Sequence, residues 1–192
     1  MQVINQFLNP SVFSELKNQV TDKNFPRYFP HTPGEPEQYV NLAYYDHQFH
    51  PSVTPKLMQC LAKCTTQLNA IAILRVKFNA TPRNAPDQIW HTDWKLSTPS
   101  KTCVIYLNTC DGYTEFRGSA RKIYSMENTA VIFDTDHEHR GIPATNVERR
   151  LVLNINYFEK LRKHIGHLES GRVVIYLLIF MKHQNHIRLD MI

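Results

Sequence analysis

The chain has 192 residues, and its 22 Lys and Arg residues against 17 Asp and Glu residues give a formal net charge of +5. This length is enough for a single domain with a substantial hydrophobic core. The basic residues are scattered rather than gathered into a tract, which argues against nucleic acid as a partner but suits a small anionic ligand.

Neither end of the sequence carries a pattern typical of membrane insertion or secretion. The N-terminal residues lack the basic start and sustained apolar core of a signal peptide. The longest apolar run, at 173–181, is much shorter than the ~20 residues of a membrane helix. The four cysteines form no CxxC pair and indicate no disulfide framework. We therefore expect no membrane partner and a reducing compartment, with a cytoplasmic location.

Two amphipathic helices are predicted in the N-terminal part of the chain. Each begins with a capping residue followed by proline, in Asn9-Pro10 and in Thr54-Pro55. Apolar residues at helical spacing follow: Val12, Phe13, Leu16 and Val20 in the first helix, and Leu57, Met58, Leu61, Cys64 and Leu68 in the second. Residues 23–53 are rich in proline and aromatic side chains, which is typical of ordered loops and short strands. This segment is either a wall or lid of the substrate site or a cover for the core.

From residue 71 onward the apolar residues alternate, which predicts strands. The candidates are 71–78, 102–108, 113–116, 120–125, 129–134 and 149–158. Short, closely spaced strands predict a sandwich or barrel-like roll, and helices placed before them predict an α+β, mainly β fold with helices buttressing one outer face. We expect one domain over 1–158, followed by a C-terminal extension at 159–192 with a polar, helix-like stretch and the apolar run.

A candidate metal site begins at His91 and Asp93. On a strand, side chains at i and i+2 share a face with Cα atoms ~6.6 Å apart, so both can reach one ion. Two imidazoles and a carboxylate hold iron(II) on one face and leave the opposite face open. A lone His-x-Asp pair is weak evidence, because a hydrogen-bonded core histidine explains it equally well. The third ligand is His137 or His139, which share strand parity and are not separated by alternation.

A candidate carboxylate site lies in the last predicted strand. Arg149 and Arg150 are adjacent, so on a strand their side chains point to opposite faces. An arginine near the metal would offer a bidentate fork to the carboxylate of an organic co-substrate, which a lysine would meet only as a point charge.

Five motifs follow one another in order between about residues 89 and 158. They are His91-Thr-Asp93, Val104-Ile-Tyr-Leu-Asn108, Asp111-Gly-Tyr-Thr-Glu-Phe116, the stretch from Thr129 through His139-Arg-Gly141, and Arg150-Leu-Val-Leu-Asn-Ile-Asn-Tyr-Phe158. In this order they resemble the iron(II)/2-oxoglutarate-dependent dioxygenases, and among them the prolyl 4-hydroxylase-like branch. Asp111 departs from the family pattern, where a glycine stands. Residues 1–88 match only loosely and 159–192 not at all.

The resemblance implies a double-stranded β-helix, or distorted jelly roll, that holds iron(II) through His91, Asp93 and His139. The family spacing from Phe133 favours His139 over His137 as the distal ligand. The retained Asp93 favours hydroxylation or another oxidation, because the family's halogenases typically lose this carboxylate.

The resemblance also implies a site for 2-oxoglutarate. It places Arg150, rather than Arg149, where the family's basic residue binds the C5 carboxylate. Tyr106 and, as a weaker candidate, Thr114 are the implied hydroxyl partners of that carboxylate. For Tyr106 the plainer alternative is a core aromatic residue whose hydroxyl bonds to the backbone.

The implied activity is that of a hydroxylase. It consumes O2 and 2-oxoglutarate, releases succinate and CO2, and oxidises a C–H bond of a prolyl residue, another peptide side chain or a small molecule, with ascorbate as a candidate reductant. One alternative is a non-enzymatic cupin-like module that binds a metal or ligand, although such a module has no need of Arg150. Another is a nucleic-acid-directed oxygenase of the same superfamily, which would need clustered basic residues that the sequence lacks.

Overall fold

The computed structural model describes residues 1–29 and 38–160, which belong to one compact unit, Met1–Lys160. The polar stretch and apolar run predicted within 161–192 lie outside the described residues. Neither of the described helices is long and apolar enough to cross a membrane.

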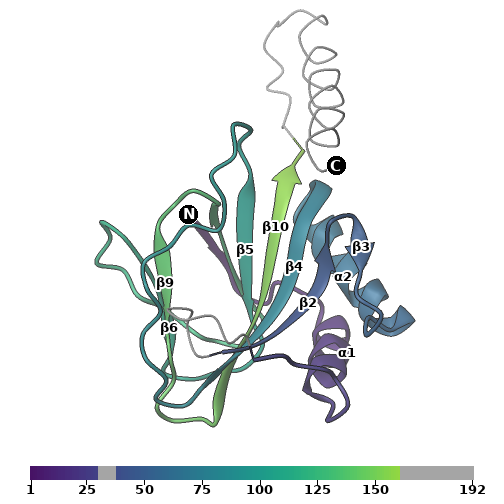
Figure 1. Cartoon of the computed structure of the whole chain (residues 1–192), viewed down its shortest axis with the longest axis horizontal. Helices are drawn as coiled ribbons and strands as arrows, with labels where there is room; N and C mark the ends of the chain where they lie inside the picture. Colours follow the sequence, from purple (N-terminus) through teal and green to yellow (C-terminus); the bar gives the residue numbers. More distant parts are fainter. Residues whose placement is uncertain (30–37, 161–192) are drawn as a thin grey trace, which may run out of the picture. The chain divides into compact units, whose positions relative to one another are not determined.

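The described chain is mainly β, with two helices that precede most of the strands (Figure 1). In chain order the elements are β1 (Gln2–Ile4), α1 (Pro10–Thr21), β2 (Tyr39–Tyr45), β3 (Gln48–Phe49), α2 (Pro55–Gln67), β4 (Ala70–Pro82), β5 (Lys101–Tyr106), β6 (Tyr113–Phe116), β7 (Ile123–Tyr124), β8 (Thr129–Asp134), β9 (His139–Ile142) and β10 (Arg149–Glu159). Both predicted helices are confirmed. The strand predicted over 120–125 is wrong in extent, because the strand β7 comprises only Ile123 and Tyr124.

The strands form two antiparallel sheets. The larger has seven strands in the order β1-β8-β5-β10-β4-β2-β3, and the smaller has three in the order β7-β6-β9. Figure 1 shows β6 and β9 in a layer apart from β5, β10 and β4, with α1 and α2 beside the larger sheet. This arrangement is the predicted double-stranded β-helix buttressed by N-terminal helices.

The capping residues start both helices as the sequence predicts. The Asn9 side chain accepts a hydrogen bond from the Ser11 backbone N–H at 3.0 Å, and Thr54 Oγ1 accepts one from the Leu57 N–H at 3.1 Å. Each cap satisfies a backbone donor that the helix leaves unpaired, which contributes about 0.5–2 kcal/mol. Met58 departs from the prediction, because its side chain is 41% exposed rather than beneath the helix.

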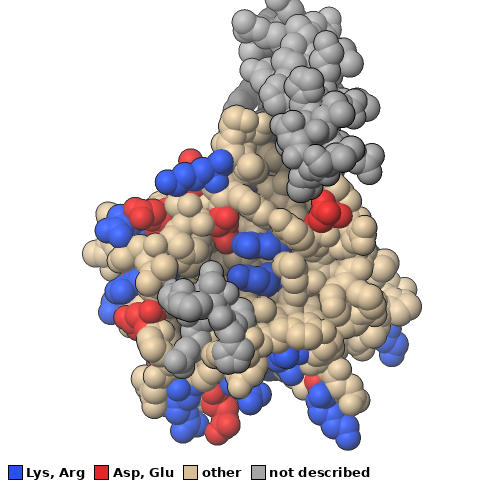
Figure 2. Space-filling model, in the orientation of Figure 1, with Lys and Arg blue, Asp and Glu red and all other residues tan. Residues whose placement is uncertain are grey.

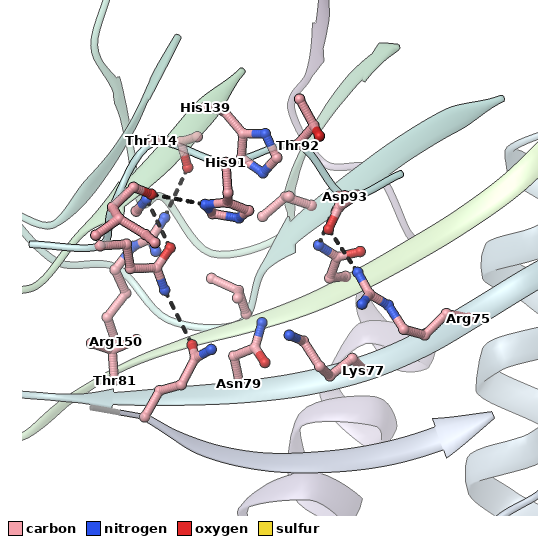
Figure 3. A pocket seen from close by; sticks show the side chains of 17 residues that line it. Arg75, Lys77, Asn79, Thr81, His91, Thr92, Asp93, Thr114, His139 and Arg150 are labelled. Atoms are coloured by element: carbon pink, nitrogen blue, oxygen red, sulfur yellow. Dashed lines mark hydrogen bonds and ion pairs between the residues drawn. The ribbon is translucent and has the colours of Figure 1, made fainter. Parts of the chain in front are cut away.

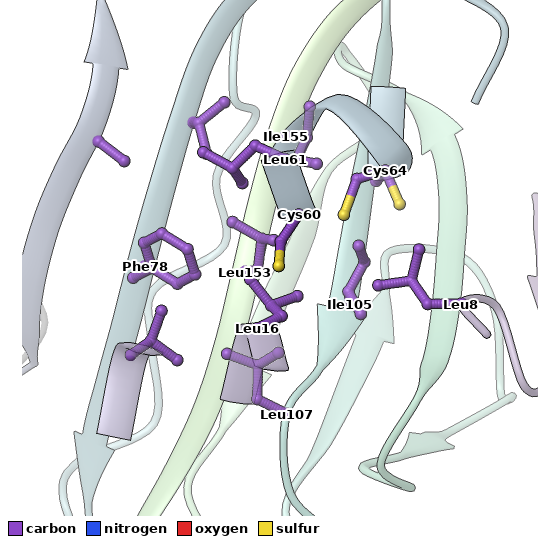
Figure 4. Packing of buried hydrophobic residues seen from close by; sticks show 14 of the residues in the cluster. Leu8, Leu16, Cys60, Leu61, Cys64, Phe78, Ile105, Leu107, Leu153 and Ile155 are labelled. Carbon is purple, nitrogen blue, oxygen red and sulfur yellow. The ribbon is translucent and has the colours of Figure 1, made fainter. Parts of the chain in front are cut away.

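The main hydrophobic core lies between the helices and the larger sheet (Figure 4). Leu16 and Leu61 from the helices pack in one cluster with Phe78, Leu153 and Ile155 from β4 and β10. Each such side chain contributes roughly 1.5–3 kcal/mol when fully buried. A second, smaller cluster lies on the other side of the sheet and joins residues of both sheets; its buried members are Val104, Tyr106, Phe116, Ile123, Val131, Phe133 and Val152.

A register shift in β4 decides which of its side chains face the interior of the roll. Ile73 and Val76 both pack in the core beside the helices, although their parity differs. The irregularity lies where Arg75 pairs with Asn156 of β10 while Ile73 pairs with Tyr157. Such a bulge moves every following side chain to the opposite parity. The polar residues of β4 therefore face the space between the two sheets: Arg75, Lys77, Asn79 and Thr81.

Candidate functional site

Three of the predicted site residues meet at one end of the space between the sheets. The ligand atoms that His91, Asp93 and His139 offer all lie within 4.8 Å of one another. His91 forms an isolated β-bridge with His139, so that each backbone N–H donates to the carbonyl of the other, at 3.0 and 2.9 Å. His91 thus extends the smaller sheet beyond β9, whereas the sequence prediction placed it on a regular strand.

Both imidazoles are oriented by backbone carbonyls. His91 Nδ1 lies 2.9 Å from the Ile89 carbonyl oxygen, and His139 Nδ1 lies 3.0 Å from that of His137. A proton on each Nδ1 leaves the Nε2 lone pair available to a metal ion. Burial lowers the pKa of His139, despite the opposing influence of Asp93, and this favours the neutral ring that a metal ligand requires.

The Asp93 carboxylate is held by a set of donors from three strands. Arg75 Nη2 donates to its Oδ1 at 2.6 Å, and Thr102 Oγ1 and Asn156 Nδ2 donate to its Oδ2 at 2.8 and 3.1 Å. Burial alone would raise the pKa of Asp93, but the charges of Arg75 and His139 and these hydrogen bonds lower it to about 2. Asp93 is therefore ionised at neutral pH and fixed in orientation.

Arg75 is a site residue that the sequence prediction missed. Its Nε also donates to Asn156 Oδ1 at 2.9 Å, and its guanidinium lies 4.9 Å from the centre of the Trp94 ring. The available signal was the alternation in β4, where polar residues at odd positions face the roll while Val76 and Phe78 face the helices.

The structure separates the two pairs of residues between which the sequence pattern alone did not decide. The His137 ring packs 5.3 Å from the Phe116 ring and does not belong to the cluster of His91, Asp93 and His139. Arg149 is exposed and lies 5.7 Å from the Tyr39 ring, whereas Arg150 lines the cavity between the sheets.

Arg150 lies in a buried cradle. Its Nε donates to Ser125 Oγ at 2.8 Å, its Nη2 donates to Thr114 Oγ1 at 3.0 Å, and its guanidinium carbon lies 5.3 Å from the Tyr106 ring centre. Burial lowers the pKa of Arg150 from its ordinary value, while Tyr106 and Cys110 act in the opposite direction. No carboxylate of the described residues pairs with Arg150, so the cradle presents a cation to the cavity.

Thr114 lines the cavity, but Tyr106 lies behind it. The Tyr106 hydroxyl donates to Thr114 Oγ1 at 2.9 Å and to the Ile123 carbonyl at 3.1 Å, and its side chain is fully buried. Burial raises the pKa of this hydroxyl, so it stays protonated at neutral pH. Direct contact between Tyr106 and a co-substrate stays a prediction, and in this geometry Thr114 stands nearer the cavity.

One cavity of about 270 Å³ connects the metal cluster with Arg150 (Figure 3). Figure 2 shows basic side chains gathered near the centre of the face that carries β4 and β10. The lining residues are Gln38, Arg75, Lys77, Asn79, Thr81, Gln88, Ile89, His91, Thr92, Asp93, Val104, Thr114, His139, Gly141, Arg150, Val152 and Asn154. Among the described residues of 23–53, only Gln38 belongs to this lining, so the aromatic side chains of that segment do not form the wall considered from the sequence.

Gln38 and Gln88 are two further cavity residues that the sequence prediction missed, and no sequence signal pointed to them. Gln88 Oε1 accepts from the Gly141 N–H at 2.9 Å, and Gln88 Nε2 donates to Gln38 Oε1 at 3.1 Å. Gln38 directly precedes β2 and Gln88 lies in the segment between β4 and β5, where neither periodicity nor spacing points to a cavity.

No protein-family model matches the chain, and no curated protein matches its sequence. Solved structures do match. An oxidoreductase of the 2OG-Fe(II) oxygenase family from Burkholderia pseudomallei has a TM-score of 0.63 at 15% identity, covering 81% of this chain and 82% of that one.

Two further structures extend the likeness. A prolyl hydroxylase from Trichoplax adhaerens, in complex with a hypoxia inducible factor oxygen degradation domain peptide fragment, has a TM-score of 0.60 at 17% identity, covering 82% of this chain and 83% of that one. HygX from Streptomyces hygroscopicus, with nickel and 2-oxoglutarate bound, has a TM-score of 0.58 at 10% identity, covering 90% and 87%. These likenesses confirm the fold predicted from the motifs, including its similarity to prolyl hydroxylases.

Proposed function

We propose that this protein is an iron(II)/2-oxoglutarate-dependent dioxygenase, and within that class a hydroxylase of a prolyl or other peptide residue or of a small molecule. The observation that carries the proposal is one cavity lined by both a His-Asp-His cluster and a buried, carboxylate-free arginine. The cluster suits a divalent cation, and the arginine suits the far carboxylate of a dicarboxylic co-substrate. The shared fold with 2-oxoglutarate oxygenases supports the same class.

The residues present fit an iron(II) ion. His91 and His139 each offer Nε2, because their Nδ1 atoms face backbone carbonyls, and Asp93 offers an ionised carboxylate. Two imidazoles and one carboxylate form the ligand set of non-haem iron oxygenases. Arg75, Thr102 and Asn156 fix the orientation of the carboxylate.

For 2-oxoglutarate, we propose that Arg150 and Thr114 bind the C5 carboxylate, with Tyr106 holding the Thr114 hydroxyl from behind. Ser125 holds the Arg150 guanidinium through the bond to Nε, and Thr114 holds it through the bond to Nη2, at the cavity that Arg150 and Thr114 both line. A hydrogen bond between charged groups contributes about 1.5–3 kcal/mol, more than a neutral pair.

The chemistry that iron(II) and 2-oxoglutarate supply when bound is oxidation of a substrate C–H bond by O2, with release of succinate and CO2. The protein's tasks are to hold the ligands, to orient the co-substrate and to exclude competing reactions. We propose ascorbate as a supporting reductant, and a cytoplasmic location that agrees with four free, buried cysteines.

Succinate release tests the class. With Fe(II), O2 and 2-oxoglutarate, the purified protein should form succinate slowly even without a prime substrate, and omission of Fe(II) should stop it. If no metal-dependent succinate appears at any pH or temperature at which the protein is folded, the proposal is wrong.

The paired variants His139→Ala and His137→Ala test the ligand assignment. Loss of one of three ligands should abolish metal binding in His139→Ala, whereas the His137 ring lies outside the cluster, so His137→Ala should bind metal as the wild type does. Calorimetric titration with Mn(II) measures both. The opposite pattern would transfer the ligand role to His137.

A further inference from the structure

Gln88 is anchored at two points on β9, beside the arginine that we propose binds 2-oxoglutarate. Its backbone N–H donates to the Gly141 carbonyl at 3.2 Å, and its side-chain Oε1 accepts from the Gly141 N–H at 2.9 Å. One residue earlier, Asp87 forms an ion pair with Arg140 of the same strand at 3.6 Å. These contacts hold the Gln88 side chain against the smaller sheet.

The side chains of Gln88 and Gln38 form an amide bridge between the two sheets. Gln88 Nε2 donates to Gln38 Oε1 at 3.1 Å, and Gln38 is 5% exposed. Gln38 directly precedes β2 of the seven-stranded sheet, whereas Gly141 belongs to β9 of the three-stranded sheet. Both glutamines line the cavity. The amide bridge is therefore a part of the cavity wall that spans from one sheet to the other.

Gly141 brings the amide bridge close to Arg150. A Cβ atom at Gly141 would lie 2.8 Å from Gln88 Oε1 and 3.1 Å from Arg150 Nη1, so these two atoms are no further apart than the sum of the two distances. Gly141 is also the register partner of Thr114, whose hydroxyl accepts from Arg150 Nη2. A carboxylate bound by Arg150 and Thr114 would therefore have the Gln88 amide beside it.

We propose that Gln88 sets the length of the 2-oxo dicarboxylate that the cavity accepts. The metal cluster and Arg150 fix the two ends of the co-substrate, so one more methylene forces its chain to bend sideways, where the amide bridge stands in its way. One methylene in a fitted pocket changes discrimination roughly 10- to 200-fold. This inference rests on the proposed function and names the residue that selects its co-substrate.

Two acids that differ by one methylene test the inference. The full chain, loaded with redox-inert Zn(II), is titrated calorimetrically with 2-oxoglutarate and with 2-oxoadipate. The wild type should bind 2-oxoglutarate at least about tenfold more tightly than 2-oxoadipate. Equal affinities for the two acids would overturn the inference.

The variant Gln88→Ala should remove most of this preference, because it opens space beside Arg150 for the longer chain. Damage to the fold alone would weaken the binding of both acids alike, so the ratio of the two dissociation constants reports selection. Gln67→Ala, at an exposed position at the end of α2, is the matched control and should keep the wild-type ratio. If Gln88→Ala also keeps the wild-type ratio, the inference is wrong.

The variant Gln88→Glu tests how near this side chain lies to the bound carboxylate. Glutamate keeps the size of the side chain and an acceptor for the Gly141 N–H, but its negative charge repels the C5 carboxylate and attracts Arg150. It should weaken 2-oxoglutarate binding by about tenfold or more. Gln67→Glu should bind 2-oxoglutarate as the wild type does. An unchanged 2-oxoglutarate affinity in Gln88→Glu would place Gln88 away from the co-substrate and overturn the inference.

Succinate release separates this inference from the proposed function. A wild type that binds 2-oxoglutarate selectively, loses the selectivity in Gln88→Ala and forms no metal-dependent succinate would support the inference and contradict the proposed function. Metal-dependent succinate from a wild type with equal affinity for both acids would do the reverse. A wild type that binds neither acid would overturn both.

Discussion

Arg150 has surroundings that distinguish it sharply from its neighbour Arg149. It is 4% exposed and bonded to Ser125 and Thr114, whereas Arg149 lies at the surface beside Tyr39. If Arg150 binds the C5 carboxylate, Arg150→Ala should raise the apparent KM for 2-oxoglutarate by about 10- to 100-fold, because a charged hydrogen bond contributes about 1.5–3 kcal/mol. Arg149→Ala should change the apparent KM for 2-oxoglutarate by less than about twofold, because a charge at the surface contributes little binding free energy.

Succinate release measured against 2-oxoglutarate concentration distinguishes the two arginine variants. Arg150→Lys should give an intermediate KM, because an ammonium group meets the carboxylate without a bidentate fork. Equal effects of Arg149→Ala and Arg150→Ala would contradict the assignment of the co-substrate site.

The sequence predicts single residues well where a motif contains them and poorly where only tertiary contact matters. His91, Asp93 and His139 stand in ordered motifs, and the structure brings all three together. Arg75 and Gln88 stand in no motif and reach the cavity only because of strand pairing and a loop contact. Alternation in β4 could at most place Arg75 on the inner face, and the partners of Arg75 and Gln88 could not be read from spacing, because they lie 18 and 53 residues away along the chain.

At the scale of elements, register decides what alternation leaves open. His137 and His139 have equal parity, but the pairing of His139 with Phe116 in β9 and β6 places its ring beside His91. In β4, the bulge near Arg75 changes the parity of the facing residues, which a simple alternating pattern does not reveal. Strands β4, β5, β6, β8 and β10 were therefore predictable from the sequence, whereas β1 and β9 were not, and the facing of individual side chains required the pairing.

The turn before β6 offers a test of how closely the elements enclose Arg150. A Cβ atom at Gly112 would lie 2.8 Å from Arg150 Cδ and 2.9 Å from the Ile142 carbonyl oxygen. Gly112→Ala should therefore displace Arg150, lower the free energy of unfolding by about 1–3 kcal/mol as overpacking does, and raise the KM for 2-oxoglutarate. Chemical denaturation and succinate release measure the two effects.

Gly118→Ala is the control for that substitution. Its Cβ would meet no atom within 4 Å, although its φ of +77° strains any side chain. It should cost stability through the backbone alone and leave the KM unchanged. A Gly112→Ala protein with a wild-type KM would show that Arg150 is not held by this turn.

At the scale of the whole molecule, several buried thiol and phenol groups have raised pKa values, and all of them make the free energy of unfolding fall as the pH rises. Burial raises the pKa of Cys64 to about 12, and it also raises those of Cys103, Tyr106 and Tyr157. A raised pKa means that the unfolded chain loses its proton first, so the stabilising contribution is full below the unfolded pKa and is lost as pH rises. The free energy of unfolding should therefore fall steadily from about pH 9 to pH 12.

Urea denaturation at a series of pH values measures this alkaline loss. Cys64→Ala should be less stable than the wild type near pH 7, because it leaves a cavity, but its stability should fall less between pH 9 and pH 12. A flat profile in the wild type would contradict the buried, protonated state of these groups.

The described unit, Met1–Lys160, should fold and bind its ligands without residues 161–192. The strands that the structure describes in the two sheets lie between Gln2 and Glu159. The Lys160 N–H donates to the Asn69 carbonyl at 2.9 Å, where β10 ends beside the start of β4. We propose that residues 1–160 form the catalytic domain. Expressed alone, they should unfold cooperatively and bind Mn(II) and 2-oxoglutarate with affinities within about threefold of the full chain, because a compact domain with its own core can fold independently. Loss of binding in a folded 1–160 protein would instead assign part of the site to residues 161–192.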